Sequence, residues 1–245
     1  MNVGIIPVRL QSERFSDKLI QPLLGKPIIQ HVIENALNFD FIDKLVIATD
    51  SPNILDYIEK YDLEYFFMGN NVWCGSQRSY YYYLQNPQYD NYISIPADEP
   101  MLDPDEINYS FNEHKPVYPI YTFYSPFYSL ERLESLLSCK VIGNDKALYF
   151  SRKTIPTSKK ELPLDVFKKH VGIFVFTNEV FKKHGDKLWS NHEGSYAKIE
   201  SLEQNIFIEN GFDVGLIKTK HKYWGIDLPE HIKEIEELYR EKKHI

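Results

Sequence analysis

Four polar side chains that could bind phosphate lie in one loop near the start of the chain. The segment IPVRLQSERFSDK places them directly after a β-branched run: Arg9, Ser12, Arg14 and Lys18. Guanidinium groups bind phosphate oxygens bidentately, and a lysine adds a point charge suited to a developing pyrophosphate. The loop has no glycine until Gly25, so it is neither a Walker A motif nor a G-x-G-x-x-G fingerprint. It therefore predicts a triphosphate site, and kinase and dehydrogenase interpretations are disfavoured.

Two acidic segments could bind a divalent metal ion. Asp98 and Glu99 follow a predicted strand in PADEP, and Asp227 stands at the start of a predicted helix in WGIDLPEH. Carboxylates suit Mg²⁺, which prefers hard oxygen ligands and keeps water or substrate phosphates in its other positions. Either aspartate alone could instead cap a helix N-terminus. As a pair, Asp98 and Asp227 predict a Mg²⁺ site.

Alternating strands and helices must position these loops. Strand patterns occur at 3–8, 44–49, 64–68 and 91–95, and helical spacing occurs at 25–38, 53–61 and 77–84. This βαβα alternation predicts an α/β fold with a mostly parallel central sheet flanked by helices. Ligands in such open sheets bind outside the carboxyl ends of the strands. We therefore expect the loop from Pro7 to Lys18, Asp50 and Asp98 to converge.

The second half of the chain is less regular. Strand-like runs occur at 116–124, 139–143, 170–176 and 212–217, and the stretch DLPEHIKEIEELYREKK predicts a closing helix. We expect these runs to extend the sheet and to supply a substrate lid. The chain is therefore expected to form a single domain, 1–245, with a substrate and dimerisation subregion at 107–210.

Composition restricts the class of partner and the location. The net charge of -7 and the lack of a basic stripe disfavour nonspecific nucleic-acid binding. No apolar run is long enough to span a membrane, and the N-terminus does not resemble a signal peptide. Cys74 and Cys139 match neither a disulfide framework nor a metal motif, so free thiols are expected. These features favour a cytoplasmic protein.

Other candidate residues have simpler structural explanations. The eight histidines include no H-E-x-x-H pair, which disfavours a zinc hydrolase. His170 would ordinarily be a buried histidine with satisfied hydrogen bonds. The tyrosine run at 80–83 is more typical of core and dimer packing than of base stacking. The KKH segment at 168–170 and the terminal EKKHI are expected to be solvated charge.

A collinear set of motifs resembles one enzyme family over nearly the whole chain. The motifs are IPVRLQSERFSDK, GKPIIQHVIENA, VIATD, CGSQR, DEPM, KALYFSRKTIP, HVGIF, IESLEQ and GIDLPEH. Together they resemble the CMP-Kdo synthetases, or 3-deoxy-manno-octulosonate cytidylyltransferases. The opening loop and ALYFSRKTIP are the most specific pieces.

The resemblance implies a Rossmann-like nucleotidyltransferase fold, a homodimer, and Mg²⁺-dependent transfer of CMP from CTP to an acidic sugar with release of pyrophosphate. Such a product serves lipopolysaccharide or capsule polysaccharide synthesis. The implied triphosphate and nucleotide contacts are Arg9, Ser12, Arg14, Lys18, Gly75, Ser76 and Arg78. The implied metal ligands are Asp98 and Asp227, which with Arg9 and Lys18 form the catalytic set. The implied sugar-acid contacts are Arg152, His170, Glu200 and Gln204.

Three departures from the family pattern limit what the resemblance implies. Pro96 and Ala97 replace a Gln-Gly pair, Gln77 replaces a glutamate, and Phe174 replaces a tyrosine. Two of these changes fall near the expected sugar. The acid could therefore be Kdo or a different one, such as 8-amino-Kdo or a nonulosonate. A noncatalytic nucleotide-binding protein of the same fold is a further alternative, which the retained Asp98 and Asp227 disfavour.

Overall fold

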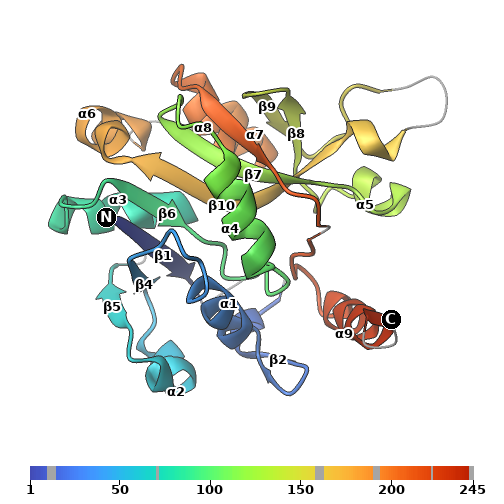
Figure 1. The fold of residues 1–245 in the computed structure, drawn as a ribbon, viewed down its shortest axis with the longest axis horizontal. Coiled ribbons are helices and arrows are strands. Elements are labelled where there is room, and N and C mark those ends of the chain that lie inside the picture. Colours follow the sequence, from blue (N-terminus) through green and yellow to red (C-terminus); the bar gives the residue numbers. More distant parts are fainter. Residues whose placement is uncertain (10–14, 70–71, 158–162, 190–193, 222, 243–245) are drawn as a thin grey trace.

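The computed structural model describes residues 1–9, 15–69, 72–157, 163–189, 194–221 and 223–242. In these ranges the chain forms a large central sheet with helices on both faces and a small two-stranded sheet (Figure 1). None of the helices found there is long and apolar enough to cross a bilayer.

The first half of the chain forms elements close to those predicted. Its strands are β1 (Asn2–Val8), β2 (Pro22–Leu23), β3 (Lys26–Pro27), β4 (Lys44–Thr49), β5 (Glu64–Phe67) and β6 (Asn91–Ser94). Its helices are α1 (Ile28–Ala36), α2 (Leu55–Ile58) and α3 (Gly75–Gln85), with 3-10 turns η1 (Lys18–Ile20), η2 (Pro52–Ile54) and η3 (Glu59–Tyr61). The helix expected over 53–61 is thus divided among η2, α2 and η3. Pro27 directly precedes α1 and has an extended backbone.

The second half contains more elements than predicted. Its strands are β7 (Ile120–Pro126), β8 (Lys140–Gly143), β9 (Ala147–Ser151), β10 (Lys168–Thr177) and β11 (Val214–Lys218). Its helices are α4 (Pro104–Glu113), α5 (Leu130–Glu134), α6 (Asn178–Leu188), α7 (Tyr196–Glu200), α8 (Gln204–Glu209) and α9 (Glu230–Lys242), with the 3-10 turn η4 (Leu164–Val166). The four expected strands and the closing helix are confirmed with shifted ends. β9 and the helices α4 to α8 were not among the predicted elements.

The central sheet combines two parallel parts. Over the described residues its order is β11-β7-β10-β6-β1-β4-β5, with β8 and β9 attached beside β10. β1 runs parallel to β4 and β6, β4 to β5, and β11 to β7. β10 runs antiparallel to both β6 and β7 and so joins the two parts. The predicted mostly parallel sheet is confirmed.

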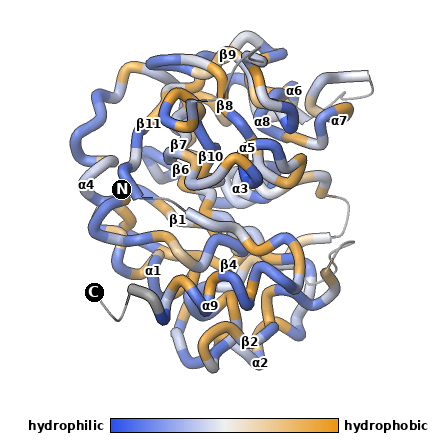
Figure 2. The backbone as a smooth tube through the Cα atoms, turned by 90° about the vertical axis from the view of Figure 1, so that its right-hand side faces the viewer, coloured by the Kyte–Doolittle hydropathy of each residue, from blue (hydrophilic) through white to orange (hydrophobic). Residues whose placement is uncertain are grey.

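Alternate side chains of the sheet point into two separate cores. In β4, Leu45 and Ile47 belong to one core, whereas Val46 and Ala48 belong to the other. Helices α1, α4 and α9 supply the first core, and α3, α6, α7 and α8 supply the second. In Figures 1 and 2, α2 and β2 lie at one end of the molecule and β8, β9 and α6 at the other. The fold is therefore a layered α/β structure.

Aromatic packing fixes α3 against the second core. Tyr80 packs against Phe181 with ring centroids 5.6 Å apart, and Tyr83 meets the edge of Tyr92 at 5.4 Å. A Cβ atom at Gly185 of α6 would lie only 2.0 Å from the Tyr80 ring, so α6 needs a glycine there. The expectation that this tyrosine run packs in the core is confirmed.

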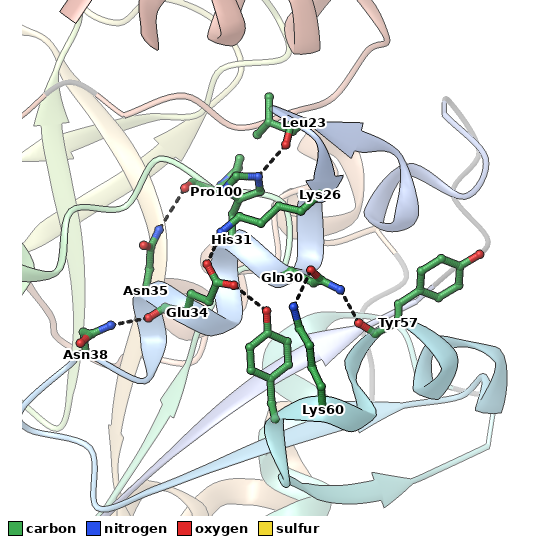
Figure 3. A network of polar contacts seen from close by, with 11 residues as sticks. Leu23, Lys26, Gln30, His31, Glu34, Asn35, Asn38, Tyr57, Lys60 and Pro100 are labelled. Atoms are coloured by element: carbon green, nitrogen blue, oxygen red, sulfur yellow. Dashed lines mark hydrogen bonds and ion pairs between the residues drawn. The ribbon is translucent and has the colours of Figure 1, made fainter. Parts of the chain in front are cut away.

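Polar side chains of α1 hold two neighbouring segments (Figure 3). Asn35 Nδ2 donates to the Pro100 carbonyl at 3.0 Å. His31 Nε2 lies 2.8 Å from the Leu23 carbonyl in β2. Helix α1 therefore anchors both the small two-stranded sheet and the chain that directly follows Glu99.

The carboxyl ends of β1, β4 and β6 lie at the same edge of the sheet because these strands are parallel. Arg9 follows β1, Asp50 follows β4, and Asp98 lies four residues after the end of β6. The expected convergence of these three segments is confirmed, and the candidate site is built there.

Candidate active site

A cavity of about 440 Å³ lies at this edge of the sheet. It is lined by eight of the predicted residues, namely Arg9, Lys18, Gly75, Asp98, Arg152, His170, Gln204 and Asp227. Three further predicted residues are not part of the lining: Ser76, Arg78 and Glu200. Ser12 and Arg14 lie outside the described residues. A cavity of several hundred Å³ with a few convergent polar groups is typical of a small-molecule site.

Lys18 and Asp98 form an ion pair in the cavity wall. Lys18 Nζ lies 2.7 Å from Asp98 Oδ2, and the side chains are 11% and 39% exposed. Lys18 begins η1, directly after Asp17, whose φ of 53° is left-handed. Arg9 adds a second cation to this part of the wall. The cations and the carboxylate together suit a phosphate chain bound with a metal ion.

Asp98 and Asp227 are brought together by a backbone hydrogen bond between distant segments. The Ile226 amide donates to the Asp98 carbonyl at 2.9 Å, so Asp227 follows a residue that directly contacts Asp98. Both aspartates line the cavity. Two carboxylates of this kind fit a Mg²⁺ ion whose remaining positions go to phosphate and water. The described residues contain no larger cluster of His, Cys, Asp or Glu arranged for a metal.

Asp98 does not cap the helix that follows it. Asp103 is the N-cap of α4, and its side chain accepts from the amides of Asp105 and Glu106. Helix α9 begins at Glu230, three residues after Asp227, and a capping role for Asp227 stays a prediction.

Gly75 begins α3 at the cavity wall. A Cβ atom there would lie 3.2 Å from Pro7 Cγ and 3.7 Å from Glu203 Oε1, so a larger residue would crowd the wall. The amide and the hydroxyl of buried Ser76 donate to Glu203 Oε2 at 3.1 and 2.6 Å. The hydroxyl implied to lie near the cytidine is thus bound to Glu203, and its nucleotide contact stays a prediction.

Arg78 lies behind the cavity in a buried ion pair. Its Nη2 atom lies 2.7 Å from Asp50 Oδ2, and the two side chains are 4% and 10% exposed. Its Nη1 atom is buried and has no hydrogen-bond partner among the described residues. Asp50 therefore fixes α3 to the end of β4, and a contact of Arg78 with the nucleotide stays a prediction.

Arg152 is held by backbone carbonyls from two segments. Its guanidinium donates to the carbonyls of Leu137 at 2.8 Å, Ser201 at 3.1 Å and Glu200 at 3.3 Å. Glu200 Oε2 accepts from the Arg152 amide at 2.8 Å. A guanidinium has five N–H donors, so these bonds leave donors for a ligand. Glu200 thus positions Arg152 from behind the lining.

His170 is buried and neutral. Thr122 Oγ1 lies 2.7 Å from the Ile173 carbonyl, to which it donates, and 2.8 Å from His170 Nε2, from which it accepts. His170 Nδ1 then accepts from Gln204 Nε2 at 3.2 Å. Burial lowers the pKa of His170 from 6.5 to about 3, with smaller contributions from neighbouring cations. His170 therefore carries no charge near neutral pH, and both ring nitrogens already have partners.

Gln204 presents an unpaired acceptor in the cavity lining. Its Oε1 atom is buried without a hydrogen-bond partner among the described residues, while its Nε2 atom is bound to His170. A buried acceptor without a partner costs free energy that a ligand hydroxyl would recover. The contact of Gln204 with a sugar stays a prediction.

Lys169 and Glu99 form an ion pair in the lining that was not predicted. Lys169 Nζ lies 3.5 Å from Glu99 Oε1, and the side chains are 12% and 11% exposed. Burial raises the pKa of Glu99, an effect that Lys169 opposes. The expectation of solvated charge over 168–170 is wrong, because His170 and the Lys169 side chain are both enclosed. β10 is irregular between Val171 and Phe174, so no simple alternation would have revealed this orientation.

Lys140 supports the Arg152 side of the cavity and was also missed. It is 1% exposed and donates to the carbonyls of Ser135, Ser138 and Arg152 at 2.6, 3.0 and 2.7 Å. These three bonds satisfy all three ammonium donors. Only the folded chain brings the carbonyls together, so the sequence carries no local signal for this role.

Both family departures near the expected sugar line the cavity. Pro96 packs closely against Gly172: a Cβ atom added to Gly172 would lie 3.1 Å from Pro96 Cβ. Phe174 is 2% exposed and packs 5.3 Å from the His170 ring and 5.6 Å from Phe207. Neither side chain offers a hydrogen-bonding group to a ligand.

Comparisons with known proteins agree with this geometry. A family model described as cytidylyltransferase matches residues 3–235. The 3-deoxy-manno-octulosonate cytidylyltransferase of Chlorobium phaeobacteroides is 30% identical, with 98% of this chain and 97% of that protein covered. The same enzyme of Parabacteroides distasonis is 31% identical over 95% of each chain.

Solved structures extend the likeness to the fold. A CMP:2-keto-3-deoxy-manno-octonic acid synthetase complexed with CTP has a TM-score of 0.83 and 26% identity, covering 98% of this chain and 99% of that one. The inositol-1-phosphate CTP transferase from T. maritima, at 15% identity and a TM-score of 0.63 over 96% of this chain and 94% of its own, shares the fold. The chain therefore belongs to the cytidylyltransferase family, among its 3-deoxy-manno-octulosonate cytidylyltransferases.

Proposed function

We propose that the chain transfers CMP from CTP to Kdo (3-deoxy-manno-octulosonate), or to a similar 2-keto-3-deoxy acid, and releases pyrophosphate. One observation carries this proposal: Asp98 and Asp227 line the same cavity as Arg152 and Gln204. A single cavity thus offers groups for a phosphate chain and groups for a polyhydroxy acid. Relatives with the same named activity support this assignment.

The reaction is an in-line displacement at the α-phosphorus of CTP. The anomeric hydroxyl of the acid attacks this phosphorus and gives up its proton to water, and the bond to the bridging oxygen of the leaving pyrophosphate breaks. No covalent enzyme intermediate is required. Arg9 and Lys18 neutralise charge on the phosphates, and the cavity orients the two substrates. Positioning and preorganised charge are the main sources of acceleration in such transfers.

Asp98 and Asp227 are the residues that would hold Mg²⁺. When bound, the ion would polarise phosphate oxygens and balance their charge. The ion pair with Lys18 fixes the orientation of the Asp98 carboxylate. The hydrogen bond from the Ile226 amide fixes the backbone beside it.

Arg152 and Gln204 are the proposed contacts for the acid. The guanidinium of Arg152 is held in place while it keeps unused donors, and Gln204 Oε1 can accept from a sugar hydroxyl. Glu200 and His170 orient these two side chains.

A homodimer and a cytoplasmic location are part of the same proposal. The proposed substrate and dimerisation subregion, 107–210, carries exposed apolar side chains on β9 and α7: Leu148, Tyr196 and Ile199. Clusters of such side chains are typical of protein interfaces. The two free cysteines suit a reducing compartment.

The test is a pyrophosphate-release screen of four nucleoside triphosphates against Kdo, 8-amino-Kdo, a nonulosonate and a neutral hexose, with Mg²⁺ present. We expect release with CTP and an acid but not with ATP or GTP, together with a CMP-sugar product identified by mass spectrometry. Asp98→Asn serves as the inactive control. Release without a CMP-sugar product, or none with any acid, would contradict the proposal.

A further inference from the structure

An acidic sugar needs a cation near its carboxylate, and His170 cannot supply one. Its two ring nitrogens are bound to Thr122 and Gln204, and burial holds its pKa at about 3. A buried carboxylate without a positive partner would be strongly disfavoured. The positive charge near the carboxylate must therefore come from Arg152 and from other cations of the lining.

Lys169 is the neighbouring cation whose contacts leave room for a ligand. It lies one residue before His170 on β10 and lines the cavity. Its Nζ atom is 3.5 Å from Glu99 Oε1 and donates to the His170 carbonyl at 3.3 Å. An ammonium has three donors, so these two long contacts leave one donor for a bound anion.

Two other lysine and arginine side chains of the lining are already engaged with carboxylates. Lys18 lies 2.7 Å from Asp98 at the proposed phosphate end. Arg132 is paired with Glu234 of α9 and lies 3.2 Å from His231 Nε2. Lys169 is bound more loosely to its carboxylate than Lys18 is, and so it can move toward a second anion without losing a short bond.

We propose that Lys169, held in the lining by Glu99, is a specificity-determining contact for the carboxylate of the acid, alongside Arg152. This inference rests on the proposed function. Glu99 balances the buried lysine before the acid binds and holds its ammonium in the cavity lining, to which Gln204 and Arg152 also belong.

The experiment compares Lys169→Gln and Lys169→Met with wild type, using the acid and its carboxamide analogue as acceptors. Losing a hydrogen bond to a charged group should raise the KM for the acid roughly 10- to 100-fold. The KM for CTP should change less than about twofold. The ratio of kcat/KM for the acid to kcat/KM for the carboxamide should fall by the same factor by which the KM for the acid rises. Lys169→Arg should retain most of that preference.

Lys168→Gln is the matched control, because Lys168 bonds to the Gly143 carbonyl and does not belong to the cavity lining. It should leave both KM values unchanged. Calorimetric CTP binding shows which variants are folded, and two neutral replacements are used so that either one can carry the test. Equal losses of kcat/KM for acid and carboxamide, or an unchanged KM for the acid, would overturn this inference and leave the proposed function intact. Failure of wild type to use any acid would overturn it together with the proposed function.

Discussion

His170 Nδ1 accepts a hydrogen bond from Gln204 Nε2 at 3.2 Å, and this contact turns Gln204 Oε1 into an unpaired acceptor in the cavity lining. The imidazole is fixed in turn by Thr122 at 2.8 Å. A neutral histidine therefore acts as a support for an amide rather than as a charged ligand. This arrangement has measurable consequences for stability and for pH dependence.

The first prediction concerns pH. The pKa of His170 falls from 6.5 to about 3 on folding, so the unfolded chain binds the proton first as pH decreases. The contribution of neutral His170 to the free energy of unfolding is complete above about pH 6.5 and is lost as the pH falls toward 3. This one group should lower the free energy of unfolding by about 1.4 kcal/mol per pH unit in that window. Urea denaturation of wild type and His170→Asn between pH 4 and 7 measures it, and equal slopes for the two proteins would contradict it.

Because His170 is neutral, we expect that its titration causes no decrease in kcat/KM between pH 6 and 8. If a charged His170 bound the acid, kcat/KM would instead decline above about pH 6.5.

The fold was largely predictable because buried strands and amphipathic helices leave periodic signals. The runs that became β1 and β4 are continuous and apolar, and α1 has five apolar residues at helical spacing. Helix α6 was missed because its sequence, NEVFKKHGDKL, is mostly polar and has Gly185 in its interior. That glycine exists for the close approach of Tyr80, a tertiary fact that no local pattern contains.

Site residues could be predicted only where they belong to a recognisable sequence motif. Asp98, Asp227 and Lys18 were found from their residue types and their positions beside predicted elements, which the resemblance reinforced, and the structure brings all three to one cavity. Lys169 was missed because a basic segment is normally expected to be exposed to solvent. Its side chain is instead mostly buried beside Glu99, which lies 70 residues earlier in the chain. At Lys169 the structure shows an ion pair that no sequence motif predicted.

The second prediction concerns the metal. EDTA should abolish turnover, and Mg²⁺ should restore it, because two carboxylates are proposed to hold the ion. Asp98→Asn and Asp227→Asn should each lower kcat by more than about 100-fold, beyond the loss typical of residues that merely support a metal ligand. Circular dichroism checks that both variants are folded. Activity near the wild-type rate in both would refute the metal assignment.

The third prediction concerns the nucleotide. A site built for a pyrimidine base should exclude purines, and a wrong base would leave buried polar groups unpaired. We expect kcat/KM for CTP to exceed that for ATP and GTP by at least about 100-fold. Steady-state rates at saturating acid measure it. Similar values for CTP and ATP would be incompatible with the prediction, whereas UTP is the more demanding comparison.

The fourth prediction concerns the buried pair of Arg78 and Asp50. Asp50→Ala should lower the free energy of unfolding by about 3–5 kcal/mol, because it leaves the 3% exposed Arg78 without its counter-charge. Urea denaturation gives the value. Asp213→Ala, which breaks an exposed pair with Lys146, is the control and should have little effect. Equal effects of the two substitutions would show that burial does not decide the cost.

The fifth prediction concerns the choice of acid. Pro96 and Phe174 line the cavity without offering a hydrogen-bonding side chain where the family pattern has an amide and a phenol. Each missing bond should weaken binding of the usual octulosonate by roughly 0.5–1.5 kcal/mol. We therefore expect specificity to shift away from Kdo, or to broaden beyond it. The measurement compares kcat/KM for Kdo, its 8-amino analogue and a neutral hexose at saturating CTP.

Phe174→Tyr restores the missing hydroxyl and should move the preference back toward Kdo, because the Phe174 ring lies beside His170 in the same cavity wall. Pro96→Gln tests the other position in the same way. Efficient use of Kdo by wild type, with no gain for another acid and no change in either variant, would reject altered specificity. Efficient use of the neutral hexose would reject the acidic substrate itself, since Arg152 and Lys169 both place positive charge where a carboxylate is expected.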